Sequence, residues 1–182
     1  MPARREQAVN VSRLPPRRRN EWLTTQDNFA SSSDTGAMKP ALLISRRETF
    51  SAAHRLCNPA LSDQRNLETY GKCANPAGHG HNYVLEVCLS GDINPESGFL
   101  YDLTALSRVI HEEIIADVDH QNLNTDVEWL DGCVPTTEVL VSRFWERLEA
   151  ALPSGLLFSV RVQETESNWA ECRRPPPAAT SG

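Results

Sequence analysis

Two histidines separated by one glycine are the most suggestive chemical feature of the sequence. His79-Gly80-His81 leads directly into an alternating apolar segment that is typical of a β-strand. In an extended chain, residues two apart point to the same side, so both imidazoles can reach one metal ion. The glycine removes a side chain where two backbones must approach closely. A turn with two exposed histidines is the alternative interpretation of this short motif.

His54 is the candidate for a third metal ligand. It follows the small residues Ala52 and Ala53 at the end of another predicted strand. If the two strands pair, His54 lies near both other histidines. Three neutral imidazoles with one open position are typical of a catalytic zinc site rather than of a closed structural one. Taken alone, His54 is interpreted as an ordinary strand-end histidine.

Cys73 is a candidate reactive thiol. The neighbouring Lys72 favours the thiolate, and a nearby zinc ion would do the same. The alternative is a small loop residue without a chemical role, and this is the interpretation of the other four cysteines. An odd number of cysteines, with irregular spacing and no CxxC motif, predicts free thiols in a reducing compartment.

Further polar residues could complete a reactive site. Asp119 directly precedes His120, and a carboxylate beside a histidine suits a proton relay, although histidine is also common at a helix end. Glu164 follows a predicted strand, where its carboxylate could accept two N–H groups from an aminopyrimidinone edge. Thr136 and Thr137 could line a pocket or cap a helix. Each of these residues has a purely structural alternative.

The elements that must position these residues follow from hydrophobic periodicity. Strict alternation predicts strands, and apolar spacings of three and four predict helices. Asp102 is placed to cap the first helix, and Pro153 and Gly155 end the second. Residues 58–73 and 119–135 are polar and are predicted as loops, the first with room for a helical turn. The predicted strands cover residues 41–50, 83–90, 156–163 and 169–172, and the predicted helices cover 103–118 and 137–148.

This order of elements predicts an α+β domain. The last two strands are joined by a short turn and can pair in an antiparallel manner. Two amphipathic helices would cover one face of a four-stranded sheet. The other face and both edges of the sheet would remain free, so we expect an oligomer.

Composition excludes several classes of protein. The chain has 182 residues, 40% of them hydrophobic and 23% charged, which is sufficient for one globular domain. A net charge of −6 disfavours a nucleic-acid partner. No apolar segment approaches the roughly 18–20 residues of a membrane span.

The Arg/Ser-rich residues 1–37 are predicted to be a disordered extension, with a targeting segment as the alternative, and Met38 could serve as an internal start. Residues 38–172 form the predicted domain, and the proline-rich residues 173–182 form a frayed tail.

Five segments occur together in one order along the chain, and the set is far more specific than any single motif. They are FSAAHRL, KCANPAGHGHNY, VDHQNL, PTTE and QETESNW. From about Ser45 to about Ala170, the sequence closely resembles the 6-pyruvoyltetrahydropterin synthase family. The resemblance implies the tunnelling fold, or T-fold: a four-stranded antiparallel sheet with two helices on one face. It further implies that three subunits form a twelve-stranded barrel and that two trimers stack into a homohexamer.

The resemblance also assigns roles to individual residues. Cys73 matches the thiol that moves protons. Asp119 and His120 match the pair from a neighbouring subunit that activates this thiol. Glu164 matches the acid that anchors the pterin ring. Thr136 and Thr137 match residues of the pterin pocket. The zinc ligands match His54, His79 and His81.

The activity that the resemblance implies is that of a cytoplasmic, zinc-dependent carbon–oxygen lyase. It converts 7,8-dihydroneopterin triphosphate to 6-pyruvoyl-5,6,7,8-tetrahydropterin, with elimination of triphosphate, in tetrahydrobiopterin biosynthesis. Zinc would acidify the side-chain hydrogens as a Lewis acid, and Cys73 would act as the base. The redox change is internal, in agreement with the absence of a GxGxxG motif.

Two other functions are weighed against this one. Relatives of the same fold make 6-carboxy-5,6,7,8-tetrahydropterin for queuosine biosynthesis and usually carry CxxxHGH. Here five residues separate Cys73 from His79, which favours the biopterin branch. A pterin-binding module without turnover would not need both Cys73 and His120.

A candidate regulatory site lies on the first predicted strand. Arg46-Arg47-Glu48-Thr49 resembles a basophilic kinase site, with Thr49 as the acceptor.

Overall fold

The computed structural model describes residues 41–175. The predicted extension 1–37, the candidate start Met38 and most of the proline-rich tail lie outside the described residues. Within the described part, no helix has the length and apolar character needed to cross a membrane. The cytoplasmic location stays a prediction.

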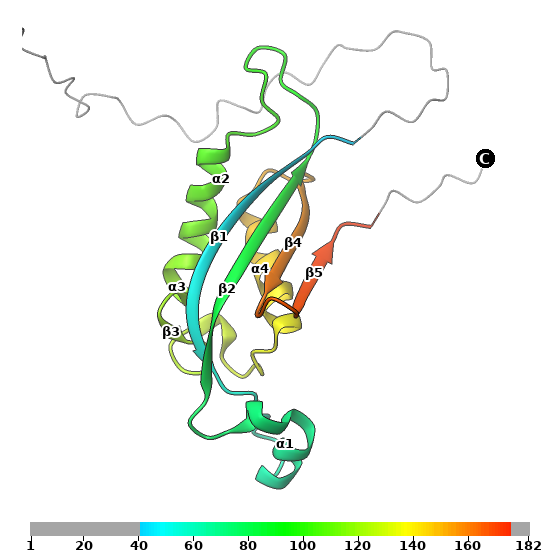
Figure 1. The fold of residues 1–182 in the computed structure, drawn as a ribbon. Helices are drawn as coiled ribbons and strands as arrows, with labels where there is room; N and C mark the ends of the chain where they lie inside the picture. Colours follow the sequence, from blue (N-terminus) through cyan, green and yellow to red (C-terminus); the bar gives the residue numbers. More distant parts are fainter. Residues whose placement is uncertain (1–40, 176–182) are drawn as a thin grey trace, which may run out of the picture. The chain divides into compact units, whose positions relative to one another are not determined.

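One sheet forms the centre of the domain, with strand order β3-β1-β2-β4-β5 (Figure 1). The predicted four-stranded antiparallel sheet is confirmed, since β1, β2, β4 and β5 pair in this manner. A short strand that the sequence did not predict, β3, joins the sheet in parallel beside Ala52 and Ala53 of β1. The strands span Leu43–His54 (β1), His79–Ser90 (β2), Gln121–Asn122 (β3), Leu157–Gln163 (β4) and Trp169–Arg173 (β5).

β1 and β2 are longer than hydrophobic alternation predicts, and this extension carries the histidines. Their pairing runs without a break from Leu43 opposite Ser90 to His54 opposite His79. Alanine, glycine and histidine give no strong strand signal, so the ends of both strands were not expected from the pattern. Hydrogen bonds between β1 and β2 nonetheless hold these residues in an extended conformation.

Helices cover one face of the sheet (Figure 1). The predicted helix over 103–118 is confirmed as a continuous helical stretch, although a π-helical turn divides it. This wider turn allows the consecutive Ile114 and Ile115 both to be buried. The second predicted helix is also confirmed, and Thr136 caps it by accepting a hydrogen bond from the Val139 N–H. The helical segments are α2 (Leu103–Ile110), the π turn (His111–Ile115), α3 (Ala116–Val118) and α4 (Thr137–Ala151).

The hydrophobic core lies between these helices and the sheet. Phe50 of β1 stacks on Tyr83 of β2 with ring centroids 4.8 Å apart, and Phe144 of α4 meets Phe50 edge-on. All three side chains are almost completely buried. Because Tyr83 is two residues after His81, this packing fixes the strand end that carries the histidines.

The segment between β1 and β2 is more regular than expected. Where a loop was predicted, helix α1 (Asp63–Tyr70) is followed by a 3₁₀ turn (Gly71–Ala74) that carries Cys73. Asn66 is the one buried residue of α1, so the helix has no apolar stripe that a sequence pattern could reveal. Its amide group instead bonds to the backbone of residues 58, 61 and 62 and holds the segment together.

The face of the sheet away from the helices is polar. Register places Arg47, Glu86, Arg161 and Glu171 in one row across β1, β2, β4 and β5, with alternating charge. Arg161 also lies over the Trp169 ring at 4.4 Å. Thr49 is exposed on β1, and its phosphorylation stays a prediction. β5 continues through Arg173, one residue into the segment predicted as a tail.

Candidate metal centre and active site

The three histidines predicted as ligands come together at the ends of β1 and β2. Antiparallel pairing sets His54 directly opposite His79, and His81 points to the same side as His79. One ligand atom from each of the three residues lies within 4.8 Å of the other two, and the Nε2 atoms of His54 and His79 are 3.1 Å apart. This cluster can hold one metal ion.

The protonation of His54 suits a metal ligand. Its Nδ1 lies 2.9 Å from the carbonyl oxygen of Pro135, which can only accept, so Nδ1 carries the proton and Nε2 keeps its lone pair. Burial lowers the pKa of His54, and burial likewise lowers the pKa of His81. The Nε2 of His81 is buried without a hydrogen-bond partner. A buried imidazole nitrogen without a partner, in a cluster of three histidines, fits a bound metal.

Gly78 brings the chain close to His54 just before the HGH motif. It has φ of +66°, and a β-carbon at this position would lie 2.9 Å from the His54 carbonyl oxygen. Both the backbone conformation and the close approach therefore require glycine. Gly71 also has positive φ (+56°), but a β-carbon there would have no atom within 4 Å.

We expect Gly78→Ala to weaken zinc binding by about 10- to 100-fold, because the added methyl group displaces the His54 backbone. Gly71→Ala is the control: it also places an alanine at positive φ but without the collision, so zinc affinity should not change. Chelator competition measures the affinity, and urea unfolding of both metal-free variants measures the strain. Equal zinc affinity of the two variants would contradict the prediction.

A pocket of about 500 Å³ next to the histidines collects four of the predicted site residues. This volume is in the range of small-molecule sites. Hydrogen bonds hold the 3₁₀ turn that carries Cys73: Leu56 N–H donates to the Cys73 carbonyl and Arg55 Nε donates to the Ala74 carbonyl. The lining residues are Leu56, Cys73, Thr136, Thr137, Glu138, Glu164, Ser167, Asn168, Trp169 and Ala170.

The β4–β5 turn contributes pocket residues that sequence reasoning did not single out. Ser167 and Asn168 lie in the turn after Glu164, and Trp169 begins β5. The Glu164 N–H donates to the Asn168 carbonyl over 3.0 Å, and this bond closes the turn. Their position in the QETESNW segment was the only signal that could have identified them.

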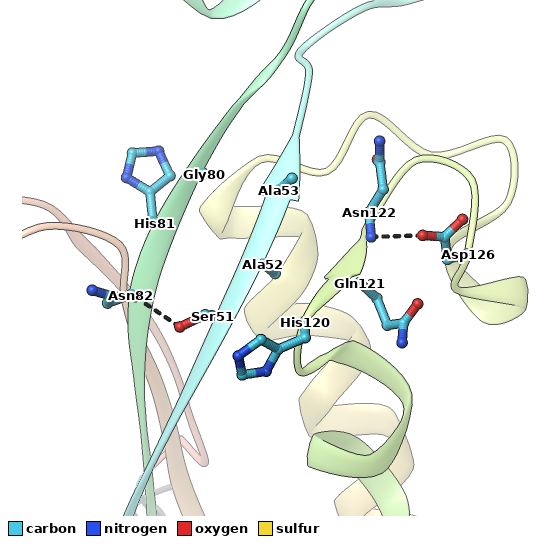
Figure 2. Close-up of a pocket in the computed structure, with 10 residues that line it drawn as sticks. All are labelled: Ser51, Ala52, Ala53, Gly80, His81, Asn82, His120, Gln121, Asn122 and Asp126. Carbon is cyan, nitrogen blue, oxygen red and sulfur yellow. Dashed lines mark hydrogen bonds between the residues drawn. The ribbon is translucent and has the colours of Figure 1, made fainter.

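His120 lines a different hollow, which His81 also borders, and Asp119 is its neighbour in the chain (Figure 2). Asp119 Oδ1 accepts the Ser51 N–H at 2.9 Å, and the His120 N–H donates to the Ser51 carbonyl. The His120 Nδ1 is 3.0 Å from Asp119 Oδ2, so the predicted pair is formed. The hydrogen bond from Ser51 lowers the pKa of Asp119, with a further contribution from His120. Figure 2 shows His81 beside β2 and His120 beside β1, and Cys73 is not among the residues that line this hollow. A single chain therefore does not place this pair in the pocket with Cys73.

His120 has an unfavourable backbone conformation. Its φ is +60°, and it is the only non-glycine residue in the described range 41–175 with positive φ. Such strain costs on the order of 1–3 kcal/mol and is common at functional sites. Parallel pairing of Gln121 with Ala52 and the bonds to Ser51 hold the residue in place.

We expect His120→Gly to be more stable than His120→Ala by about 1 kcal/mol, because both variants lose the side chain and only glycine relieves the strain. At the neighbouring Gln121, where φ is not positive, the order should reverse and alanine should be the more stable variant. Urea unfolding of the four variants gives the two differences. The same order at both positions would show that His120 is unstrained.

Comparison with known proteins settles the family. A sequence model of the 6-pyruvoyl tetrahydropterin synthase family matches residues 43–175. The chain belongs to this family. Human 6-pyruvoyl tetrahydrobiopterin synthase is 42% identical over 137 residues, which cover 75% of this chain and 94% of the human protein. The solved structure of Caenorhabditis elegans 6-pyruvoyl tetrahydropterin synthase superposes with a TM-score of 0.71 at 39% identity, over 75% of this chain and 97% of that one.

Membership of the 6-pyruvoyl tetrahydropterin synthase family makes the chain a lyase and confirms the T-fold expected from the five motifs. A more distant relative is a putative 6-carboxy-5,6,7,8-tetrahydropterin synthase from Archaeoglobus fulgidus. It is 33% identical over 138 residues, which cover 75% of this chain and all of that protein. The family thus acts on pterins. The branch to which an individual member belongs must be determined from the residues of its own site.

Proposed function

We propose that the chain is a zinc-dependent lyase that converts 7,8-dihydroneopterin triphosphate to 6-pyruvoyl-5,6,7,8-tetrahydropterin with release of triphosphate. The observation that carries the proposal is one site with two parts: three converging imidazoles and, beside them, a pocket that holds a thiol and a carboxylate. The neutral imidazoles of His54, His79 and His81 would hold the zinc ion. Zinc, when bound, supplies Lewis-acid polarisation of the substrate side chain.

The remaining site residues bind the ring and move protons. Glu164 accepts N–H groups of the pterin, and Thr136 and Thr137 line the same pocket at the start of α4. Cys73 removes a proton from side-chain carbon next to oxygen, which both triphosphate elimination and the internal redox shift require. His120, oriented by Asp119, takes the thiol proton and so maintains the thiolate.

We further propose a homohexamer whose active site lies between subunits. His120 and Cys73 line different hollows of one chain, so a proton relay between them needs a second copy. The polar sheet face and the edge of β5, which pairs with no further strand among residues 41–175, leave room for the barrel that the resemblance implies. Native mass spectrometry tests the number of subunits, and a monomer with full activity would contradict the shared site.

The product identifies the reaction. Zinc-loaded protein is incubated with 7,8-dihydroneopterin triphosphate, and the pterin is identified by mass spectrometry. We expect 6-pyruvoyltetrahydropterin and one triphosphate per turnover. A 6-carboxy product with acetaldehyde would instead assign the chain to the branch of the archaeal relative, with the site unchanged. Zinc binding without any turnover would indicate a pterin-binding module.

A further inference from the structure

The carboxylate of Glu164 faces the metal-binding histidines as well as the pocket. Its Oε1 lies 3.5 Å from Nε2 of His54 and 3.7 Å from Nε2 of His81, and the side chain is only 19% exposed. The turn behind it is closed by two bonds, from the Glu164 N–H to the Asn168 carbonyl and from the Asn168 N–H to Thr165 Oγ1. Glu164 is therefore held at the boundary between the two parts of the site.

These distances do not describe hydrogen bonds. An N–H···O bond needs about 2.7–3.2 Å between its heavy atoms, and both separations are longer. Two ligands of one tetrahedral zinc ion, each about 2.0–2.2 Å from the metal, lie about 3.4 Å from each other. The separations of Glu164 Oε1 from His54 and His81 agree with this second geometry.

The hydrogen bonding of His54 and His81 is also consistent with a metal ion next to Glu164. His54 donates its Nδ1 proton to Pro135, so its Nε2 presents a lone pair to the carboxylate. The Nε2 of His81 is buried without a hydrogen-bond partner. In the tautomer that leaves the lone pair on this atom, His81 can bind a cation that lies between it and the carboxylate. A metal ion shared by the imidazoles and the carboxylate satisfies all of these atoms.

We propose that Glu164 is the fourth ligand of the metal while the pocket is empty, and that the incoming pterin draws it away. The inference rests on the proposed function, which already assigns the pterin N–H groups to this carboxylate. When those N–H groups bind Glu164, the fourth metal position opens to the side chain of the same substrate. The metal would thus be shielded until the correct ring is bound.

Cobalt(II) provides a test that does not require turnover, because its visible absorption depends on the ligands and geometry of the site. We expect Glu164→Gln to change the visible spectrum of the Co²⁺-loaded protein and to weaken zinc binding by about 10-fold or more. Glu138→Gln is the matched control, since it removes the same charge from an exposed side chain of the same pocket. Its spectrum and zinc affinity should equal those of the wild type.

The outcomes separate ligation from simple attraction. If Glu164→Gln weakens zinc binding but leaves the Co²⁺ spectrum unchanged, the carboxylate acts at a distance and the inference is wrong. Urea unfolding of the metal-free variants checks folding, and Glu164→Asp, whose shorter carboxylate cannot reach the metal, should reproduce the spectral change. Adding 7,8-dihydroneopterin to wild-type Co²⁺ protein should shift the spectrum, whereas an unchanged spectrum would contradict displacement. The metal-only arm remains valid even if the product assay rejects the proposed reaction.

Discussion

Cys73→Ala is expected to lower kcat by about 1,000-fold, within the range that a positioned general base contributes. The Cys73 side chain is the only thiol among the residues that line the proposed pterin pocket, next to the three histidines that could hold a metal ion. Neither the His cluster nor the buried core depends on its side chain, since Cys73 is only partly buried. Zinc content and the unfolding midpoint should therefore stay at wild-type values while product formation is slowed.

Cys133→Ala is the control for this experiment. Cys133 is a partly buried free thiol like Cys73, but it lies in the loop before α4 and contacts Arg143 rather than the pocket. Its removal should leave turnover unchanged. Cys73→Ser, which keeps the shape but raises the pKa of the group far above that of a thiol, should be nearly as slow as Cys73→Ala. Retention of more than about a tenth of the activity in Cys73→Ala would place the base elsewhere.

Mixing two inactive variants should restore activity if the site is shared between subunits. Cys73→Ala and His120→Ala each remove one part of the relay, so each alone is expected to be slowed by about 100-fold or more. In a mixed oligomer, one interface can combine an intact thiol from one chain with an intact Asp119–His120 pair from its neighbour. Random assembly of equal amounts makes about one quarter of the sites complete, because each of the two contributions is intact with a probability of about one half.

The experiment requires exchange of subunits, which dissociation in mild urea and joint refolding provides. Activity of the mixture should approach a quarter of the wild-type value, and separately refolded variants that are combined afterwards should show none. The double variant Cys73→Ala/His120→Ala, mixed with wild type, controls for refolding, since it can form no complete site with itself. A mixture as inactive as its components would mean that each chain carries its own relay.

Local patterns in the sequence already predicted most of the secondary structure and named the candidate site residues. Alternation in β4 and the three-and-four spacing in α4 follow from burying one side of each element, and this is a property of consecutive residues. The HGH motif placed two imidazoles on one side of a strand for the same reason. Helix α1 was missed because polar bonds from Asn66, rather than an apolar stripe, hold it in place.

Distances between segments far apart in the chain were decided only by the tertiary structure. The unbroken β1–β2 register brings His54 to His79, and the β4–β5 turn directs Glu164 to the same cluster. Neither the 3.5 Å approach of that carboxylate to His54 nor the separation of His120 from Cys73 leaves a trace in local periodicity. Residue types and spacings name the groups that can react, whereas packing of the sheet against its helices determines which of them meet, since burial of the whole core sets every strand's register.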